Sequence, residues 1–376
     1  MSFTTDDHRF MSLALKLASK GNGATSPNPM VGAIVVRNKK IIGRGYHRRA
    51  GGPHAEVLAL NQAGSKAHGA TLYVTLEPCS HTNKRTPPCV PSIVESKVRR
   101  IVVAMKDPNP KVNGRGIRQL RKMGFLVDVG CLQAEAANLN EVYCHWVKTG
   151  RPFVILKGAM TLDGKIATSR GESKWITGDE SRKHVHVLRS QVDAILVGSG
   201  TILRDNPQLT ARLPQRQQTN TQVRQPVRVV LDSSLRIPIS AKVLRWAAEN
   251  STVVATTNRA SSSKISRLSN AGISVWVLPK QGNRVSFATC LKKLGQLGLT
   301  SVLIEGGSEV HASALRSGLV NKVMLYIAPA LLGGLDSKSL IGGPNPKGLS
   351  DKISLNKIEI QKVGQDLLVS GYPQGR

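Results

Sequence analysis

Hydrophobic positions in the first third of the chain switch repeatedly between helical and strand spacing. Apolar residues fall on one helical face from Phe10 to Ala18, and the same spacing returns from Pro91 to Val98. Short β-rich runs lie between and after them, at Val31 to Val36, Thr71 to Leu76 and Arg100 to Met105. Helices and strands that alternate at this size predict an α/β layered domain.

The alternation restarts after a short polar segment, Lys148 to Pro152, which contains both glycine and proline. We therefore expect a boundary there, with one domain over residues 1–148 and a second, larger one over residues 151–376. Residues Pro214 to Gln225 are rich in Gln, Thr and Arg and are expected to form an exposed loop. Seven strands are predicted for the second sheet: Phe153–Leu156, Ala194–Gly198, Val227–Leu231, Thr252–Ala255, Ile273–Leu278, Ser301–Ile304 and Lys322–Ile327.

The composition is that of a globular protein, except for its charge. With 376 residues the chain is long enough for two hydrophobic cores, and its net charge of +30 first suggests a nucleic-acid partner. The excess is spread evenly, however: residues 1–150 hold 22 basic and 9 acidic side chains, and residues 151–376 hold 31 and 14. Only 4% of residues are aromatic, which disfavours a base-stacking surface. We therefore expect a basic surface rather than a nucleic-acid-binding one.

Neither a membrane span nor an export signal is expected. The longest relevant uncharged apolar run, Val323 to Leu335, has 13 residues, whereas a spanning helix needs about 20. Asp6 and Asp7 stand where a secretory signal would carry basic residues. The five cysteines are an odd number in a long chain, which argues against a disulfide framework. These features predict a cytoplasmic protein.

The strongest chemical signal is a set of metal-ligand residues. His54 and Glu56 form an H-x-E motif, and Cys79 follows a proline, with Cys89 ten residues later. One imidazole and two thiolates are a zinc-ligand set that leaves a fourth position for water. Both ligand segments are expected to begin helices, where backbone N–H groups favour thiolates. Glu56 would not bind zinc but would carry the proton from that water to the departing amine.

Two other interpretations compete with this one. A lone H-x-E motif is common, and a lone buried cysteine is usually a small core residue. A zinc-stabilised binding module without catalysis is also conceivable, but a structural site usually closes with a fourth protein ligand and needs no glutamate. Since the two elements occur in the right context of turn, helix and strand, we interpret them as a catalytic site.

The cysteine spacing and several further motifs narrow the class of enzyme. The chain resembles the bifunctional pyrimidine deaminase/reductase family of riboflavin biosynthesis over essentially its whole length. The motifs that carry the resemblance are Ser26–Ala33, Gly51–Glu56, Glu77–His81, Thr86–Cys89, Asp107–Pro110, Gly114–Gly116, Met160–Ala167, Gly171–Gly178, Val197–Pro207, Leu209–Arg212 and Ile304–Gly307. One departure is a loop at Thr82-Asn83-Lys84 that is one residue longer than usual.

The resemblance implies a cytidine-deaminase-like α/β/α layer domain followed by a dihydrofolate-reductase-like α/β domain. It implies zinc-dependent hydrolytic deamination of 2,5-diamino-6-(5-phosphoribosylamino)pyrimidin-4-one, and then reduction of the ribosyl side chain to ribityl by NADPH. The partner would be this small pyrimidine ribotide phosphate, not a membrane, and a homo-oligomer is compatible with it. The alternative is a basic zinc deaminase acting on tRNA or single-stranded DNA, with an accessory domain.

The resemblance also assigns site residues. In the first domain Asn28 and His47 would lie close to the deaminated ring. Contacts to NADPH are implied for Ala159, Trp175, Thr201, Asp205, Ser233, Gly306 and Gly307. Contacts to the ribotide are implied for Ser173, Arg189, Leu209, Arg212 and Glu305.

Some of these residues have physical uses of their own. No G-x-G-x-x-G motif follows a strand, so a simple Rossmann domain is disfavoured. Gly306-Gly307 enters a helix, where backbone N–H groups meet phosphate, although glycine pairs also mark plain turns. Trp175 could cover a planar ring or belong to the core. The guanidinium groups of Arg189 and Arg212 suit a phosphate, or would otherwise be solvated surface charges.

Overall fold

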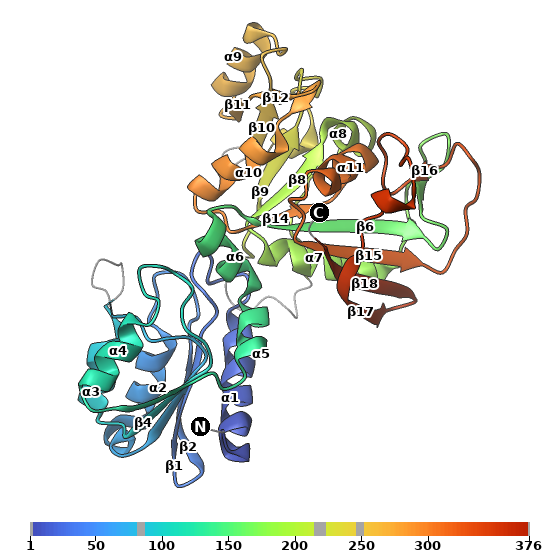
Figure 1. The fold of residues 1–376 in the computed structure, drawn as a ribbon. Helices are drawn as coiled ribbons and strands as arrows, with labels where there is room; N and C mark the ends of the chain where they lie inside the picture. The colour runs from blue at the N-terminus through green and yellow to red at the C-terminus, as the bar shows by residue number, and fades with distance from the viewer. Residues whose placement is uncertain (1–2, 81–86, 214–222, 246–251, 375–376) are drawn as a thin grey trace. The chain divides into compact units, whose positions relative to one another are not determined.

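The computed structural model describes residues 3–80, 87–213, 223–245 and 252–374, and it divides the chain into two compact units, Met1–Gly150 and Arg151–Arg376 (Figure 1). Most of the expected loop at Pro214 to Gln225, and the loop at residues 82–84, lie outside the described residues. No helix within the described ranges is both long and apolar enough to cross a membrane.

The first unit is a five-stranded sheet between two layers of helices, with strand order β2-β1-β3-β4-β5. β1 runs antiparallel to both β2 and β3, and β3, β4 and β5 are parallel. Its elements are α1 (Thr5–Ala18), β1 (Gly32–Arg37), β2 (Lys40–Tyr46), α2 (Ala55–Ala63), β3 (Thr71–Val74), α3 (Cys89–Ser96), β4 (Arg100–Val103), α4 (Arg115–Lys122), β5 (Leu126–Val129), α5 (Gln133–Leu139) and α6 (Glu141–Thr149).

Alternate side chains of the central strands build a core on each face of this sheet. Val35, Leu72 and Ile101 pack with α2, α3 and α4 on one face. Ile34 and Tyr73 pack with α1 and α5 on the other (Figure 1). The α/β/α layering predicted for this domain is therefore confirmed.

Two glycines let α2 lie directly on β2. A Cβ atom at Gly45 would stand 2.2 Å from the carbonyl oxygen of Ala55, and one at Gly43 would stand 2.1 Å from that of Ala59. Any larger residue would push the helix away from the strand. This close approach fixes the N-terminal end of α2, where His54 is the N-cap residue.

The second unit contains a nine-stranded sheet of order β11-β10-β9-β8-β14-β6-β15-β18-β17. Seven strands are parallel, and the C-terminal hairpin of β17 and β18 adds an antiparallel edge. The strands of this sheet are β6 (Phe153–Thr161), β8 (Ala194–Gly198), β9 (Val227–Leu231), β10 (Thr252–Thr256), β11 (Ser274–Val277), β14 (Ser301–Ile304), β15 (Lys322–Ala328), β17 (Leu355–Val363) and β18 (Asp366–Pro373).

Helices cover this sheet on both faces. Side chains of α10 and α11 pack with Leu156, Leu196 and Ile304 in the main core. On the other face Val185 of α7 packs with Tyr326 and Leu368 (Figure 1). The helices and short strands are β7 (Lys165–Ala167), α7 (Asp179–Gln191), α8 (Ser199–Asp205), α9 (Ser262–Asn270), β12 (Lys280–Gln281), β13 (Arg284–Val285), α10 (Phe287–Gln296), α11 (Ser308–Arg316) and β16 (Lys338–Ser339).

All seven strands predicted for the second unit are strands of this sheet. The sequence pattern did not predict β2 and β5 in the first unit, nor the β17–β18 hairpin and the short strands β7, β12, β13 and β16 in the second. β2 contains two glycines, and β17 is an edge strand whose residues are mostly exposed and polar. Neither therefore carries the apolar run of a buried strand.

Candidate functional sites

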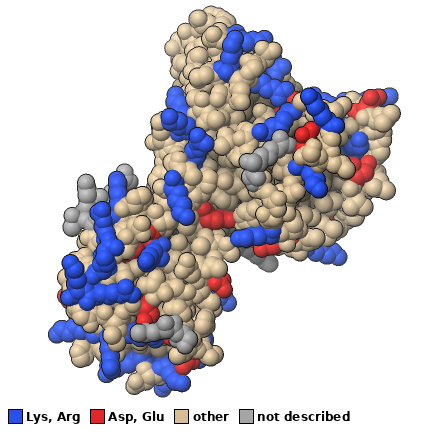
Figure 2. Space-filling view, in the orientation of Figure 1, with Lys and Arg blue, Asp and Glu red and all other residues tan. Residues whose placement is uncertain are grey.

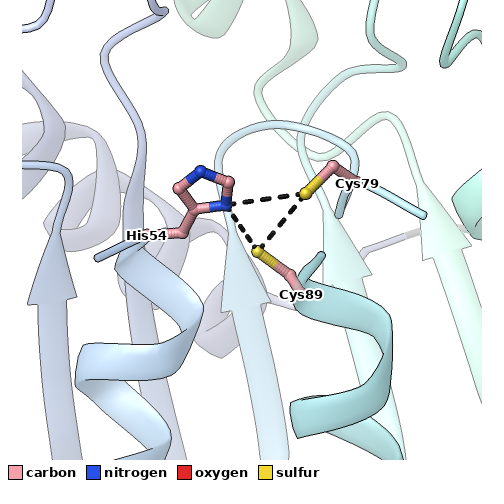
Figure 3. Close-up of side chains that lie close together, drawn as sticks. All are labelled: His54, Cys79 and Cys89. Atoms are coloured by element: carbon pink, nitrogen blue, oxygen red, sulfur yellow. Dashed lines mark hydrogen bonds between the residues drawn. The ribbon is translucent and has the colours of Figure 1, made fainter. Parts of the chain in front are cut away.

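Three side chains from separate segments meet at one end of the first unit's sheet (Figure 3). His54 is the N-cap residue of α2, and Cys89 is the first residue of α3. Cys79 lies in the loop after β3, and its carbonyl oxygen accepts hydrogen bonds from the N–H groups of Cys89, at 3.1 Å, and Val90, at 3.3 Å. The expectation that both ligand segments begin helices holds for His54 and Cys89, which stand at the starts of α2 and α3, but not for Cys79, which belongs to no helix.

The geometry of this group fits zinc. The Nδ1 atom of His54 lies 2.9 Å from the Sγ atom of Cys89 and 3.5 Å from that of Cys79, and the two sulfurs are 3.7 Å apart. Tetrahedral zinc with ordinary bond lengths would place such ligand atoms about 3.6 Å (N to S) and about 3.8 Å (S to S) apart. The two distances from the Cys79 sulfur match these values, whereas the His54–Cys89 distance of 2.9 Å is shorter. Three ligands leave a fourth position for water, as a catalytic site requires.

Replacing Cys79 by serine is expected to remove zinc from the protein. Serine leaves only one thiolate beside His54, and an uncharged hydroxyl is a poor zinc ligand. Metal analysis of the purified variant should show close to no zinc, against one ion per chain in the unaltered protein. A variant that retains full zinc would overturn the ligand assignment.

Glu56 lies in the first turn of α2, directly beside the ligands. It is buried, at 3% exposed. Burial, followed by the neighbouring Cys79, raises the pKa of the Glu56 carboxyl. A buried carboxyl of raised pKa next to a water-binding position is suited to take up and release a proton.

Asn28 and His47 form a hydrogen-bonded pair next to this group. The Nδ1 atom of His47 lies 3.1 Å from the carbonyl oxygen of Pro53, which can only accept, so that nitrogen carries the proton. Its Nε2 atom then accepts from the amide of Asn28, 3.1 Å away. Burial lowers the pKa of His47, in agreement with a neutral ring. The rings of His47 and His54 are edge-on, with centroids 5.5 Å apart.

Glu77 is a residue of this region that the sequence analysis missed. Its buried carboxylate accepts four backbone N–H groups, from Asp107 at 3.2 Å, Gly114 at 2.7 Å, Gly116 at 3.0 Å and Ile117 at 3.4 Å. The segment 107–117 is thereby held against Pro78 and so beside Cys79. The sequence shows Glu77 and the two glycines of that segment, but it does not show that the backbone N–H groups of the glycines bind the Glu77 carboxylate.

The second unit contains a cavity of about 1070 Å³. This volume slightly exceeds the range of single small-molecule sites, so it has room for a cofactor and a substrate together. Of the residues that the resemblance assigned to NADPH or ribotide, all but Ser233 line it: Ala159, Ser173, Trp175, Arg189, Thr201, Asp205, Leu209, Arg212, Glu305, Gly306 and Gly307. Ser233 follows β9, and its hydroxyl accepts a hydrogen bond from the N–H of Val285.

A buried ion pair lies in the wall of this cavity. The guanidinium of Arg189 donates to both carboxylate oxygens of Glu305, through Nε at 2.7 Å and Nη2 at 2.6 Å, and its Nη1 donates to the carbonyl of Thr210 at 3.1 Å. Burial alone would raise the pKa of Glu305, but Arg189 holds it below its ordinary value.

Two further cavity residues were missed by the sequence analysis, Lys157 on β6 and His186 on α7. Burial lowers the pKa of Lys157. The charge of Glu305 opposes this shift, and the charge of Arg189 adds to it. Burial and the two neighbouring arginines lower the pKa of His186 to about 4, so its ring is neutral near pH 7. Lys157 lies in the apolar strand β6, and the sequence pattern there indicates a strand but not that this side chain lines a cavity.

Two other candidates, Trp175 and Gly306, and one further acidic residue of the Met160–Ala167 motif, Asp163, can be placed. Trp175 is 72% exposed, with the guanidinium of Arg182 4.6 Å from its ring centre, so it does not belong to the core. Gly306 has a φ of 142° and enters α11 beside the hydroxyl of Thr201. Asp163 does not line the cavity; its carboxylate instead accepts from the hydroxyl of Thr161 and from backbone N–H groups of residues 332 and 333.

Comparison with known proteins gives consistent results for both units. The family model for the cytidine and deoxycytidylate deaminase zinc-binding region matches residues 4–105, and that for the RibD C-terminal domain matches residues 152–369. The curated riboflavin biosynthesis protein RibD of Aquifex aeolicus (strain VF5) is 44% identical over 96% of this chain and 97% of its own length. That of Actinobacillus pleuropneumoniae is 43% identical over 97% and 95%.

Solved structures agree over the full length. Form 1 of Acinetobacter baumannii RibD has a TM-score of 0.88 and 36% identity, covering 98% of this chain and 99% of that one. The diaminohydroxyphosphoribosylaminopyrimidine deaminase/5-amino-6-(5-phosphoribosylamino)uracil reductase of Thermotoga maritima has a TM-score of 0.82 and 35% identity, with coverage of 98% and 99%.

Proposed function

Because the chain belongs to the RibD family of bifunctional riboflavin-biosynthesis enzymes, we propose how its own residues divide the deaminase and reductase reactions between the two units. The predicted fold, zinc deaminase activity and NADPH reductase activity are confirmed at the level of this family. The observation that carries the assignment of residues is the group His54, Cys79 and Cys89 with the buried Glu56 beside it.

In the first unit, Glu56 moves the proton. Zinc, when bound by the three ligands, supplies the activation of water for hydrolysis. The buried carboxylate of Glu56 takes the water's proton, gives it to the ring nitrogen and then helps the exocyclic amine to leave. Asn28 and His47 hold the pyrimidine ring in place, with Asn28 kept in position by its bond to the neutral His47.

In the second unit, the cavity orients the ribosyl chain toward NADPH, which supplies the hydride. The exposed ring of Trp175 covers the cofactor, and the turn at Gly306-Gly307 offers backbone N–H groups to its phosphates. Arg212 is exposed and binds the ribotide phosphate, while Arg189 is already occupied by Glu305 and keeps that carboxylate charged. Ser233 lies outside the cavity lining, at the carboxyl end of β9, and would contact only an extended cofactor.

The direct test is incubation with the diaminopyrimidine ribotide, with and without NADPH, while product mass is followed. Without NADPH, the mass should change by exchange of an amine for an oxygen. With NADPH, two hydrogens should be added as well. If no deaminated product forms with a zinc-loaded enzyme, the proposed assignment of the first unit is wrong.

Residues 151–376 alone are expected to reduce the already deaminated ribotide. This unit has its own sheet and its own core, and the whole cavity lies within it. NADPH oxidation followed by absorbance should proceed with the fragment at a rate close to that of the full chain. A fragment that is folded by circular dichroism yet inactive would contradict the independence of the reductase unit.

The alternative of a nucleic-acid-acting deaminase is not favoured by the family. Figure 2 shows Lys and Arg over much of the visible face of both units, without confinement to one stripe. RNA or single-stranded DNA should therefore compete only weakly with the ribotide, and the competition should fade as salt rises. A complex that survives physiological salt would require a nucleic-acid partner. Cytoplasmic location and oligomeric state remain predictions, for cell fractionation and light scattering to decide.

A further inference from the structure

The N-terminal end of α7 is bound by a residue from the other end of the unit. Its N-cap residue is Gly178, which has no side chain to accept the free N–H groups of the first turn. Asp366, the first residue of β18, binds two other groups at this end: its Oδ2 atom accepts from the N–H of Gly178 itself at 2.8 Å and from the side-chain hydroxyl of Ser181 at 2.5 Å. The two contacts join positions 188 and 185 residues apart.

This carboxylate is fully buried and is not balanced by an ion pair in the described part of the chain. Asp366 is 0% exposed, and its second oxygen, Oδ1, has no hydrogen-bond partner among the described residues. A buried, half-satisfied carboxylate costs free energy, and the partial positive charge of a helix N-terminus offsets only part of it.

The junction at the N-terminal end of α7 separates two groups of cavity residues. Before it lies the segment 173–178, here called the cover segment, which brings Ser173, Trp175 and Thr177 to the cavity. After it α7 carries His186 and Arg189 to the same cavity. The junction therefore sets the position of one group relative to the other.

Few hydrogen bonds hold the cover segment to the rest of the unit. In the described ranges, those that reach beyond α7 are two: Ser173 to Asp205, at 3.4 Å, and Gly178 to Asp366. The other polar contacts are with Arg182 of α7 itself, which donates to the carbonyl of Thr177 at 2.7 Å and lies over the ring of Trp175. Asp366 thus forms the shorter of the two links between the cover segment and another element.

We propose that Asp366 is a positioning residue of the reductase, which fixes the cover segment to the C-terminal hairpin so that Trp175 and Ser173 meet the cofactor and the ribotide. The proposal rests on the proposed function of the cavity. Asp366 does not line the cavity and does not touch the reacting atoms; it acts through Gly178 and Ser181.

The test replaces Asp366 by asparagine in the full-length, zinc-loaded enzyme. The dissociation constant and KM for NADPH should rise about tenfold, because a charged hydrogen-bond acceptor is lost at the junction. The kcat of reduction should change less than about threefold, since no group that touches the reacting atoms is altered. Deamination in the same sample should be unchanged, because it takes place in the other unit.

Two further variants separate positioning from simple stabilisation. Ser181→Ala removes one of the two contacts, and its effect on NADPH affinity should be smaller than that of Asp366→Asn and not additive with it. Glu359→Gln removes a carboxylate from an exposed position of the same hairpin and should leave both activities unchanged. Should Asp366→Asn fail to fold, Ser181→Ala alone still decides the proposal.

The outcomes are distinct. If Asp366→Asn lowers the melting temperature while the KM for NADPH stays at its original value, or if Ser181→Ala leaves NADPH affinity unchanged, Asp366 has only a structural role and the proposal is overturned. A rise in KM that the Glu359→Gln variant shares would also overturn it. If the unaltered enzyme does not reduce the deaminated ribotide at all, it is the proposed function of the cavity that fails.

Discussion

Replacing Glu56 by glutamine is expected to reduce deamination by about three orders of magnitude or more while zinc remains bound. Glutamine has nearly the same shape, so the three ligands keep their places, but it cannot accept the water's proton. Removal of a general acid–base group costs about 10²- to 10⁴-fold, and here one group serves more than one proton transfer. Product mass gives the rate, and metal analysis gives the zinc content.

The chain offers its own controls for this variant. Reduction of the already deaminated ribotide should proceed at the original rate, since it takes place in the second unit. Glu95→Gln, an exposed carboxylate on α3, should leave deamination unchanged. If Glu56→Gln deaminates as fast as the unaltered enzyme, Glu56 is not the proton carrier.

Replacing Arg189 by alanine is expected to abolish reduction and to destabilise the second unit. Glu305, with its side chain 5% exposed, would then be a buried carboxylate without its bidentate partner. Breaking a buried pair in this way costs about 3–5 kcal/mol. Reduction should fall more than about a hundredfold, and the melting transition of the second unit should move to lower temperature, whereas deamination continues.

Arg189→Lys and Arg212→Ala sharpen this prediction. Lysine keeps the charge but cannot donate two parallel hydrogen bonds to Glu305, so it should restore little of the lost activity. Arg212 is exposed and lacks such a buried partner in the described structure, so its removal should raise the KM for the ribotide about tenfold or more and leave stability unchanged. Equal losses of stability in Arg189→Ala and Arg212→Ala would contradict the distinction.

The pattern of apolar residues predicted the central strands, which helices cover on both faces. These strands have long apolar runs because both of their faces are buried. The β17–β18 hairpin was not predicted because β17 is exposed along most of its length, Ile360 included at 66% exposed, and in β18 the buried Leu368 stands between the exposed Leu367 and the half-buried Val369, so neither strand has a continuous buried apolar run.

The metal ligands could be predicted because His54, Cys79 and Cys89 lie in two short motifs that are close together in the sequence, and because histidine and cysteine are typical zinc ligands. The ion pair of Arg189 and Glu305 could not, since the two partners are 116 positions apart in the sequence and either side chain alone suits a solvated surface. Lys157 is notable because it is buried in the wall of the cavity, and Glu77 because backbone N–H groups bind its carboxylate. Both features depend on residues that are distant in the sequence, so they cannot be predicted from the residues themselves.

The contact between β2 and α2 makes the metal site depend on residues that do not bind the metal. An added methyl at Gly45 would meet the carbonyl oxygen of Ala55 at 2.2 Å, whereas ordinary van der Waals contact begins at 3.4 Å, so the helix would have to retreat by more than an ångström. His54 would retreat with it, since it is the residue that starts this helix. A saturation-mutagenesis library of the first unit should therefore yield zinc-deficient clones at Gly45, on a strand that bears no functional group, almost as readily as at the ligands themselves.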